Sequence, residues 1–308
     1  MIKKIKAFAV LAICSGVILF IAGCKNDTDT KYIEISPYRS TFTSMENYSK
    51  AKLVTVTSEN VTVNKTSGSQ VFKDNGVKIS PYAIGRYEVT QELFKAVMGY
   101  NPSYYTGTLE NTNAAGSEEQ KLRPAEYVSF YDAITFCNKL SLLCGMKESD
   151  LVYSVKTDGK EVDWANIDYL GVPKFCNGSW DSCRQDLTKK GYRLPTPAEW
   201  EFAARGGNQK KDVWNYKYSG SETISQVAWY GSTAGTHETG LKEANGLGIY
   251  DMSGNVWEWC FSTESDGKRY NCGGSFGSSA SDCTVASRHA DKANYCHSRV
   301  GFRLARTF

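Results

Sequence analysis

The last third of this 308-residue chain, from Val213 onward, is rich in Gly, Ser, Asn and aromatic residues and has few runs of helical periodicity. Upstream, residues 53–63 alternate and are β-branched, which predicts a strand or hairpin, and residues 82–89 predict another strand. A few helices combined with a long, loop-rich segment of short strands are typical of an α+β domain. We therefore expect residues 51–308 to form one α+β domain.

Three segments carry the start and stop signals of short helices. Each begins with a residue that can cap a helix N-terminus and ends at a glycine, over residues 90–99, 129–145 and 196–206. In the third, Thr196 and Glu199 form a capping box with Pro197 at the first helical position. Apolar residues recur at helical spacing within each segment, which supports the three assignments.

The first residues have the pattern of a lipoprotein signal peptide over residues 1–23. Three lysines precede an apolar run at residues 7–22, and small residues stand before Cys24. A membrane-spanning anchor is the alternative, but the run is short for one. We expect a lipid on Cys24 that anchors the chain in the cell envelope, at the surface of the outer membrane.

The segment after the expected cleavage point, residues 24–50, is rich in Thr, Ser, Asn, Asp and Lys and is expected to be a tether. The leader lysines Lys3, Lys4 and Lys6 account for the whole formal net charge of +3. The mature chain is therefore neutral, which gives no electrostatic reason to expect a nucleic-acid partner.

Eight cysteines remain after Cys24: Cys137, Cys144, Cys176, Cys183, Cys260, Cys272, Cys283 and Cys296. Export permits disulfides, but the spacing alone does not fix the pairing. Two histidines, His289 and His297, lie near the last two cysteines. Their spacing fits no compact zinc motif, so we do not expect zinc.

Seven motifs follow one another along the chain, among them GYRLPTPAEWEFAARGG from Gly191 and NGLGIYDMSGNVWEWC from Asn245. The other five begin at Gly85, Glu126, Val227, Gly273 and Val300. Together and in this order they resemble the formylglycine-generating-enzyme (sulfatase-modifying-factor) family. The resemblance implies a C-type-lectin-like fold, loop-rich, with small mixed sheets and flanking helices.

The Ser-Gly-Asn turn in the second of these motifs carries the oxygen donors of a metal site. The carboxylates of Asp251 and Glu258 and the backbone carbonyls of Gly254 and Val256 can be directed at one point, and hard oxygen ligands suit calcium. By resemblance, the same four positions match a calcium site of the family. The alternative is a structural turn in which Asn255 has a positive φ. We expect a structural calcium ion.

The family resemblance also places the enzymes' catalytic pair on this chain. Those enzymes bind copper through two cysteines, five residues apart, after a Gly-Gly-Ser turn. Here the first position is Ser278 and the second is Cys283. Copper(I) requires soft ligands, and a hydroxyl does not replace a thiolate. We therefore expect neither copper nor catalysis, and Cys283 is available for a disulfide with Cys260.

Residues 276–298 contain no Glu, Gln, Met or Trp and a single Lys. Random substitution of adenines in Asn codons produces this deficit, because those codons then cannot reach these five residue types. The segment resembles the variable region of diversity-generating-retroelement proteins, which use the C-type-lectin fold and include treponeme-type surface lipoproteins. We therefore expect a variable ligand-binding region over residues 270–303.

By this resemblance, the variable side chains form one solvent-facing surface that binds a ligand, expected to be a protein. The expected contact residues are Tyr270, Asn271, Cys272, Gly277, Ser278, Ser279, Ser281, Asp282, Thr284, Ser287, His289, Ala290, Asn294, Tyr295, Cys296 and His297. The first alternative is an envelope lipoprotein of the same fold that is not diversified and has a structural or regulatory role. The second is a formylglycine-generating oxidase of sulfatase maturation.

Overall fold

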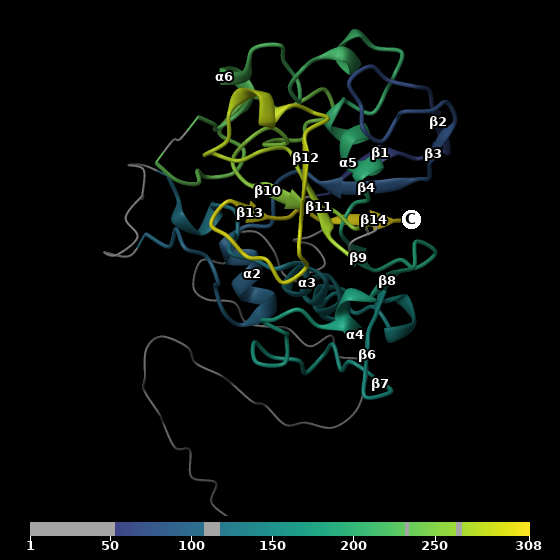
Figure 1. Ribbon diagram of the computed structural model, residues 1–308, viewed down its shortest axis with the longest axis vertical. Coiled ribbons are helices and arrows are strands. Elements are labelled where there is room, and N and C mark those ends of the chain that lie inside the picture. The colour runs from purple at the N-terminus through teal and green to yellow at the C-terminus, as the bar shows by residue number, and fades with distance from the viewer. Residues whose placement is uncertain (1–52, 108–117, 232–233, 263–266) are drawn as a thin grey trace, which may run out of the picture.

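The computed structural model describes residues 53–107, 118–231, 234–262 and 267–308 (Figure 1). The predicted signal peptide, the lipidated Cys24 and the tether lie outside these residues. Within the described part of the chain, no helix is long and apolar enough to cross a membrane.

The three helices predicted from the sequence are confirmed. They are α2 (Gln91–Met98), α3 (Phe130–Leu143) and α5 (Pro197–Ala204). The side chains of Thr90, Ser129 and Thr196 each accept a hydrogen bond from the backbone N–H three residues later, at 3.3, 3.1 and 3.2 Å. A glycine in the left-handed conformation follows each helix, as the sequence predicted.

The first four-stranded sheet is antiparallel and contains the C-terminal strand. Its order is β1 (Leu53–Thr57), β4 (Tyr82–Gly85), β14 (Ala305–Thr307) and β9 (Tyr192–Arg193). The hairpin considered for residues 53–63 is wrong, because β1 pairs with β4, whereas β2 (Val61–Val63) pairs with β3 (Val77–Ile79).

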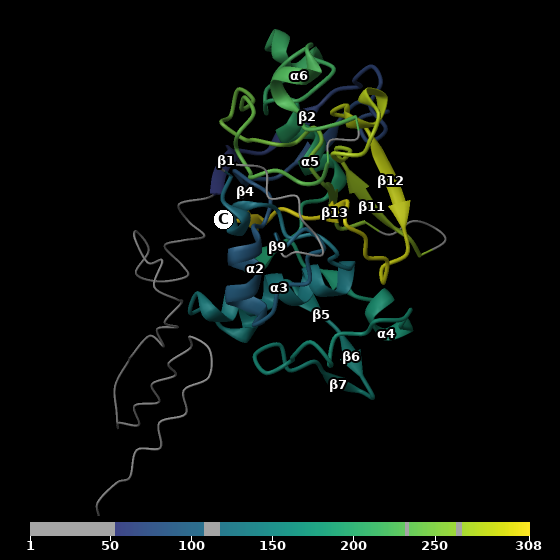
Figure 2. The same cartoon turned by 90° about the vertical axis from the view of Figure 1, so that its left-hand side faces the viewer.

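The second four-stranded sheet is mixed. Its order is β12 (Arg288–Asp291), β11 (Arg269–Cys272), β10 (Trp257–Trp259) and β13 (Val300–Gly301). The pair β10–β13 is parallel and the other two pairs are antiparallel. Figure 2 shows β11 and β12 along one edge of the molecule, on the side away from β1 and β4. Residues 302–304 join β13 to β14 and so connect the two sheets.

The remaining elements are short. They are α4 (Gly178–Asp181), α6 (Ile224–Val227), the pair β5 (Tyr153–Ser154) and β8 (Arg184–Gln185), the pair β6 (Lys156–Thr157) and β7 (Lys160–Glu161), and 3-10 turns at Gln120–Leu122, Glu148–Asp150, Asp212–Asn215 and Ala280–Cys283. The sequence analysis assigned no function to the segment 154–183. In the structure it adds short strands and turns on the side of the molecule that carries α3.

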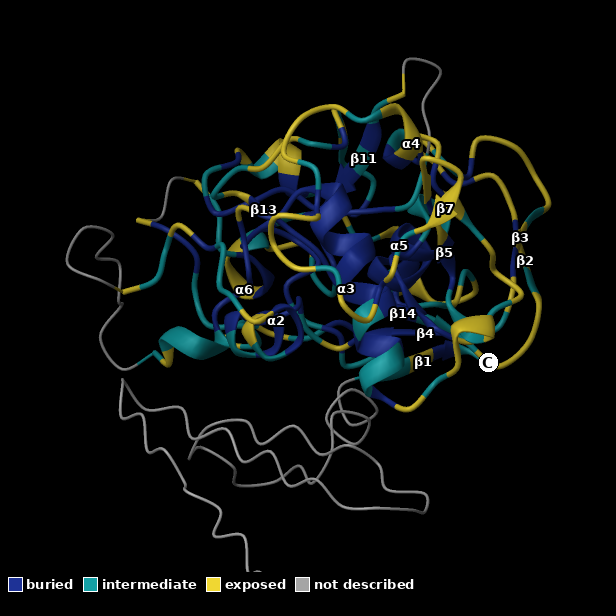
Figure 3. Cartoon of the chain, turned by 90° about the horizontal axis from the view of Figure 1, so that it is seen from below, coloured by how far each residue is buried: buried dark blue, intermediate teal, exposed yellow. Residues whose placement is uncertain are grey.

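Two apolar clusters hold these layers together. In the first, the ring of Phe94 in α2 stacks on Phe136 in α3 at 5.5 Å between centroids, and Phe302 contacts both rings edge-on. In the second, Trp214 packs on Phe72 and Phe202 behind β4 and α5. Figure 3 shows α3 among the buried parts of the molecule. The fold is the α+β class expected from the sequence.

Candidate functional site

A groove of about 820 Å³ lies beside the β11–β12 hairpin. Its lining comes from β10, β11, β12, the turn after Phe276 and one residue of the N-terminal region: Gln70, Trp257, Tyr270, Gly277, Ser278, Ser279, Asp282, Ala286, Ser287, Arg288, His289, Ala290 and Arg299. Serines, two arginines and two aromatic rings dominate this lining. The groove therefore offers hydrogen-bond donors, positive charge and apolar surface together.

The pairing of β11 with β12 places side chains from both faces of these strands beside the groove. Tyr270 pairs with Ala290, and the guanidinium of Arg288 lies over the Tyr270 ring, 4.2 Å from its centroid. On the other face of the strands, Asn271 donates to the Asp291 carboxylate at 2.8 Å, and the exposed His289 ring lies 3.1 Å from the same carboxylate. The alternation of a strand thus separates the cation–aromatic pair from a polar network.

The Gly-Gly-Ser turn supports the floor of this region. The backbone N–H of Ser275 donates to the Ser278 hydroxyl oxygen at 3.0 Å, which closes the turn. Gly274 has φ of 80°, and a Cβ there would lie 2.6 Å from the Cys283 sulfur, so only glycine fits. Cys283 is buried, and burial raises the pKa of its thiol to about 12. The pair of positions that holds copper in the enzymes of the family is thus one hydroxyl and one buried thiol here.

Eight of the sixteen contact residues predicted from the sequence line this groove: Tyr270, Gly277, Ser278, Ser279, Asp282, Ser287, His289 and Ala290. The residues predicted at 294–297 lie in the next loop, where Asn294 hydrogen-bonds Cys176. Ser281 is exposed, and the hydroxyl of Thr284 lies 2.7 Å from that of Ser287.

Two of the predicted contact residues are corrected by the structure. Asn271 is 1% exposed because it lies under Asp291, and Cys272 is 3% exposed because it packs against Cys260. Neither side chain can contact a ligand at the surface without rearrangement. Composition alone did not reveal this, because Asp291 and Cys260 cover these two side chains only in the folded chain.

Sequence reasoning missed five residues of the lining, namely Gln70, Trp257, Ala286, Arg288 and Arg299. The prediction rested on the positions expected to vary, so framework residues were not among the predicted contacts. One signal was present: Arg288 and Arg299 are long cationic side chains in a segment otherwise dominated by small residues.

The predicted disulfide between Cys260 and Cys283 is also corrected. Cys260 follows β10 and Cys272 ends β11, and their sulfur atoms lie 3.7 Å apart. The Cys283 thiol instead donates to the carbonyl of Ser275. All three cysteines are free thiols in the structure. The sulfur that neighbours Cys260 is therefore that of Cys272.

Thiol exposure gives a direct test of this arrangement. Of the eight cysteines in the described residues, Cys176 and Cys296 are exposed and the other six are buried. After reduction, we expect a maleimide at pH 8 to modify these two within minutes and the six others only in denaturant. Peptide mass mapping reads out the sites. Rapid native labelling of Cys283 would contradict the burial described here.

A buried carboxyl group fixes the loop next to the groove. Glu126 is fully buried and accepts hydrogen bonds from the backbone N–H groups of Tyr104 at 3.0 Å and Tyr105 at 2.8 Å. The Tyr105 ring packs edge-on against Phe276, 5.4 Å away. Burial raises the pKa of Glu126 to about 8, although both hydrogen bonds lower it.

This raised pKa predicts a pH-dependent stability. A Glu side chain in the unfolded chain has a pKa of about 4.3. Between about pH 4.5 and 8, the folded chain therefore holds a proton that the unfolded chain has released. The contribution of Glu126 is therefore full at low pH and is lost as pH rises, at up to about 1.4 kcal/mol per unit. We expect Glu126→Gln to flatten the urea-denaturation profile over this window, while Glu59→Gln, at an exposed site, leaves it unchanged. Identical slopes for Glu126→Gln and the parent would contradict the assignment.

Three buried carboxyl groups meet one buried arginine below the sheets. The Arg303 guanidinium binds Glu258 through two hydrogen bonds of 2.6 Å, and Trp200 donates to the same carboxylate at 2.6 Å. Burial and the neighbouring acids raise the pKa of Glu88 well above its usual range. Burial raises the pKa of Asp251 to about 6. The group thus holds more acidic than basic side chains.

The predicted calcium ligands fit this arrangement only in part. One carboxylate oxygen of Asp251 is buried without a hydrogen-bond partner, whereas the other accepts from Gly240 at 2.7 Å. Glu258, however, has both oxygens engaged by Arg303 and Trp200 and so does not fit as a bidentate ligand. In the described residues no three His, Cys, Asp or Glu side chains are grouped to hold a metal. Calcium stays a prediction, checked by whether a chelator lowers the melting temperature.

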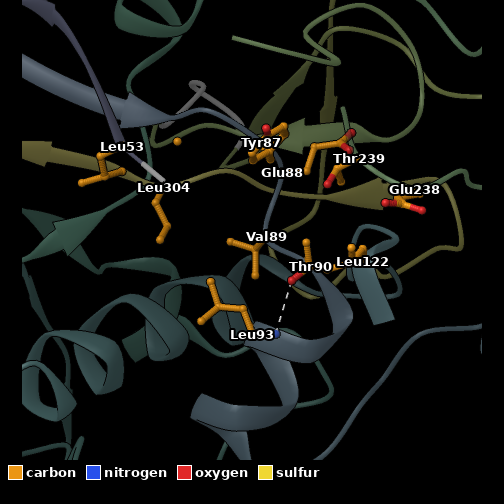
Figure 4. Close-up of a pocket in the computed structure, with 11 residues that line it drawn as sticks. Leu53, Tyr87, Glu88, Val89, Thr90, Leu93, Leu122, Glu238, Thr239 and Leu304 are labelled. Carbon is orange, nitrogen blue, oxygen red and sulfur yellow. Dashed lines mark hydrogen bonds between the residues drawn. The ribbon is translucent and has the colours of Figure 1, made fainter. Parts of the chain in front are cut away.

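A smaller cavity of about 180 Å³ lies next to this acidic group (Figure 4). Leu53, Val89 and Leu93 form its apolar side. Its buried carboxylate, Glu88, already accepts hydrogen bonds from Asn255 at 2.8 Å and from the backbone of Val256 at 3.2 Å. Since that carboxylate is satisfied within the scaffold, we assign no ligand to this cavity.

Comparison with known proteins agrees with this geometry. The family model of the sulfatase-modifying factor enzyme 1-like domain matches residues 39–308. The chaperone protein LppX of Paenibacillus barcinonensis is 35% identical over 268 residues, which are 79% of this chain and 86% of that protein. A formylglycine-generating enzyme of Thermomonospora curvata is 33% identical over 162 residues, 41% of this chain and 53% of the enzyme.

A solved structure with a similar sequence is that of Treponema denticola variable protein 1. It superimposes with a TM-score of 0.73 at 36% sequence identity, over 83% of this chain and 94% of that one. The superposition extends over most of the chain and is not confined to a single motif, so the similarity concerns the whole domain. The chain therefore belongs to the sulfatase-modifying factor enzyme 1-like domain family, and it has the C-type-lectin-like fold of the formylglycine-generating enzymes.

Proposed function

We propose that this protein is a lipid-anchored recognition protein, exposed at the surface of the outer membrane, that binds a protein ligand in the groove beside β11 and β12 and catalyses no reaction. The observation that carries the proposal is the lining of that groove. It gathers eight of the residues predicted to be replaceable. At the two positions where the family's enzymes hold copper, the chain has the hydroxyl of Ser278 and the buried thiol of Cys283.

Two similarities support a role other than catalysis. The chain is similar over most of its length to a variable protein and to a chaperone protein, and neither name denotes an enzyme. The similarity to the formylglycine-generating enzyme of Thermomonospora curvata covers only about half of that enzyme. The scaffold therefore supports recognition, with the groove as its variable part.

Sequencing the gene from many clonal descendants of one cell tests the recognition role. We expect differences confined to the codons of groove residues such as Gly277, Ser279 and His289, at the positions where a nearby near-copy of codons 270–303 has adenine. The codons for Gly273 and Gly274 serve as an internal control, because the turn admits only glycine there. Variation spread evenly over the gene would contradict the proposal.

An assay of formylglycine formation tests the absence of catalysis. The purified protein is supplied with copper(I), oxygen and a cysteine-containing sulfatase peptide, and the peptide mass is followed. We expect no conversion, because the hydroxyl of Ser278 does not replace the first of the two thiolates that copper(I) requires. Conversion that disappears in the Cys283→Ser variant would show that the protein is an oxidase.

A second candidate is an envelope lipoprotein that binds one fixed partner. The similarity to the chaperone protein LppX, over 86% of that protein, favours it. The sequencing experiment separates the two candidates, because a fixed partner requires an invariant groove. No variation among descendants of one cell, with the same groove residues in independent isolates, would select this second candidate.

A further inference from the structure

The groove contains two arginines for which the structure gives no ion pair with a carboxylate. Of the buried arginines, Arg193, Arg205 and Arg303 are each paired with a carboxylate at 2.6 to 2.8 Å, whereas Arg269 donates to backbone carbonyls. Arg288 and Arg299 have no such partner in the described part of the chain; the structure gives each of them an aromatic neighbour instead. Both line the groove.

The aromatic contacts hold each guanidinium in a defined place. The Arg288 guanidinium lies 4.2 Å from the centroid of Tyr270, and that of Arg299 lies 5.6 Å from Phe276. A guanidinium that packs on a ring keeps its N–H donors free at its edge, where they match the two oxygens of a carboxylate. The groove thus presents two positioned donors to a ligand.

Gly277 gives Arg299 its position. A Cβ at residue 277 would lie 2.5 Å from the Arg299 Cζ, 2.7 Å from Nε and 2.8 Å from Nη2. The backbone of Gly277 does not have a positive φ, so other residues fit its conformation. A side chain there would therefore move a flexible arginine and leave the fold intact. The residue at position 277 therefore determines where the Arg299 guanidinium can lie.

We propose that the groove binds an acidic peptide segment, whose carboxylates are recognised by Arg288 and Arg299, and that Gly277 determines this specificity. The inference rests on the proposed recognition function and adds the class of ligand. Asp282 also lines the groove, which disfavours a dense polyanion such as a nucleic acid or sulfated glycan and favours isolated carboxylates. Trp257 and the serines suit the apolar and polar side chains around them.

A random dodecapeptide phage library, selected on the detergent-solubilised full-length chain, tests the ligand class. We expect Asp- and Glu-containing peptides to be enriched. Synthetic copies should bind about ten- to a hundredfold more weakly to Arg288→Gln and Arg299→Gln, since hydrogen bonds to charged groups carry this much affinity. Gly277→Ala should reproduce the loss seen with Arg299→Gln while keeping the parent melting temperature.

Arg306→Gln is the matched control, because Arg306 also packs on an aromatic ring, Tyr192, but lies outside the groove. It should bind like the parent. Peptides without acidic residues, or affinities unchanged by Arg299→Gln, would overturn the acidic-peptide assignment and leave a recognition protein of another specificity. Binding of heparin or single-stranded DNA in preference to the peptides would also overturn it. Failure of the proposed function would appear separately, because an invariant groove would select the candidate with one fixed partner and peptide oxidation would show an oxidase.

Discussion

Replacement of Glu258 by Gln should lower the free energy of unfolding by about 3 to 5 kcal/mol, because it removes the carboxylate that binds the fully buried Arg303 guanidinium through two hydrogen bonds. Arg303 is 0% exposed and also donates to the carbonyls of Gly85 and Tyr250, both at 2.9 Å. It therefore connects β4, the turn before β10 and the C-terminal segment. Loss of the charge at Glu258 destabilises the place where both sheets meet.

Urea denaturation at pH 7 measures this effect. Glu161→Gln is the control, because Glu161 forms an exposed pair with Lys156 at 3.9 Å and should cost less than about 1 kcal/mol. A loss below about 1 kcal/mol for Glu258→Gln would mean that Arg303 is satisfied by other groups.

Gly254→Ala should destabilise the protein by more than about 4 kcal/mol, enough to reduce the yield of folded chain. Gly254 has φ of 84°, and a Cβ there would lie 2.1 Å from the carbonyl oxygen of Trp229. That carbonyl accepts a hydrogen bond from Asn255 at 2.9 Å, so the backbone cannot move away without losing a contact. The clash is therefore between two backbone segments, and moving a flexible side chain does not relieve it.

The control for this substitution separates backbone strain from the clash. Gly248 has a similar φ of 75°, but no atom lies within 4 Å of its added Cβ. Gly248→Ala should therefore cost only about 1 to 2 kcal/mol, the strain of the left-handed conformation. Thermal melting of both variants is compared with the parent. Equal losses of stability in the two variants would show that the Trp229 backbone moves aside at little cost.

The sequence predicted the features that depend on neighbouring residues. The caps of α2, α3 and α5 were predictable because Thr90, Ser129 and Thr196 bond backbone groups only three residues away. The partner of β1 was not predictable, since β4 begins 25 or more residues later and a nearer strand looked equally suitable. Pairing over such distances depends on the whole fold.

The region of the candidate site was predictable from the sequence, but the contacts within it were not. Composition located the groove region, because small and polar residues are concentrated near the C-terminus. It could not show that Glu258 binds Arg303, because the two residues meet only through the pairing of β10 with β13. For the same reason it could not show that Gly277 gives Arg299 its position.

The position of the C-terminal strand has a consequence for chains that end before it. β14 lies between β4 and β9, and β13 completes the second sheet, yet both are made after every residue of the groove. A frameshift or stop codon within residues 276–298 would remove both strands and leave neither sheet complete. Under the proposed diversification, a gene copy altered in this way would encode a chain that completes neither sheet, so only chains that include both strands would fold and bind a ligand.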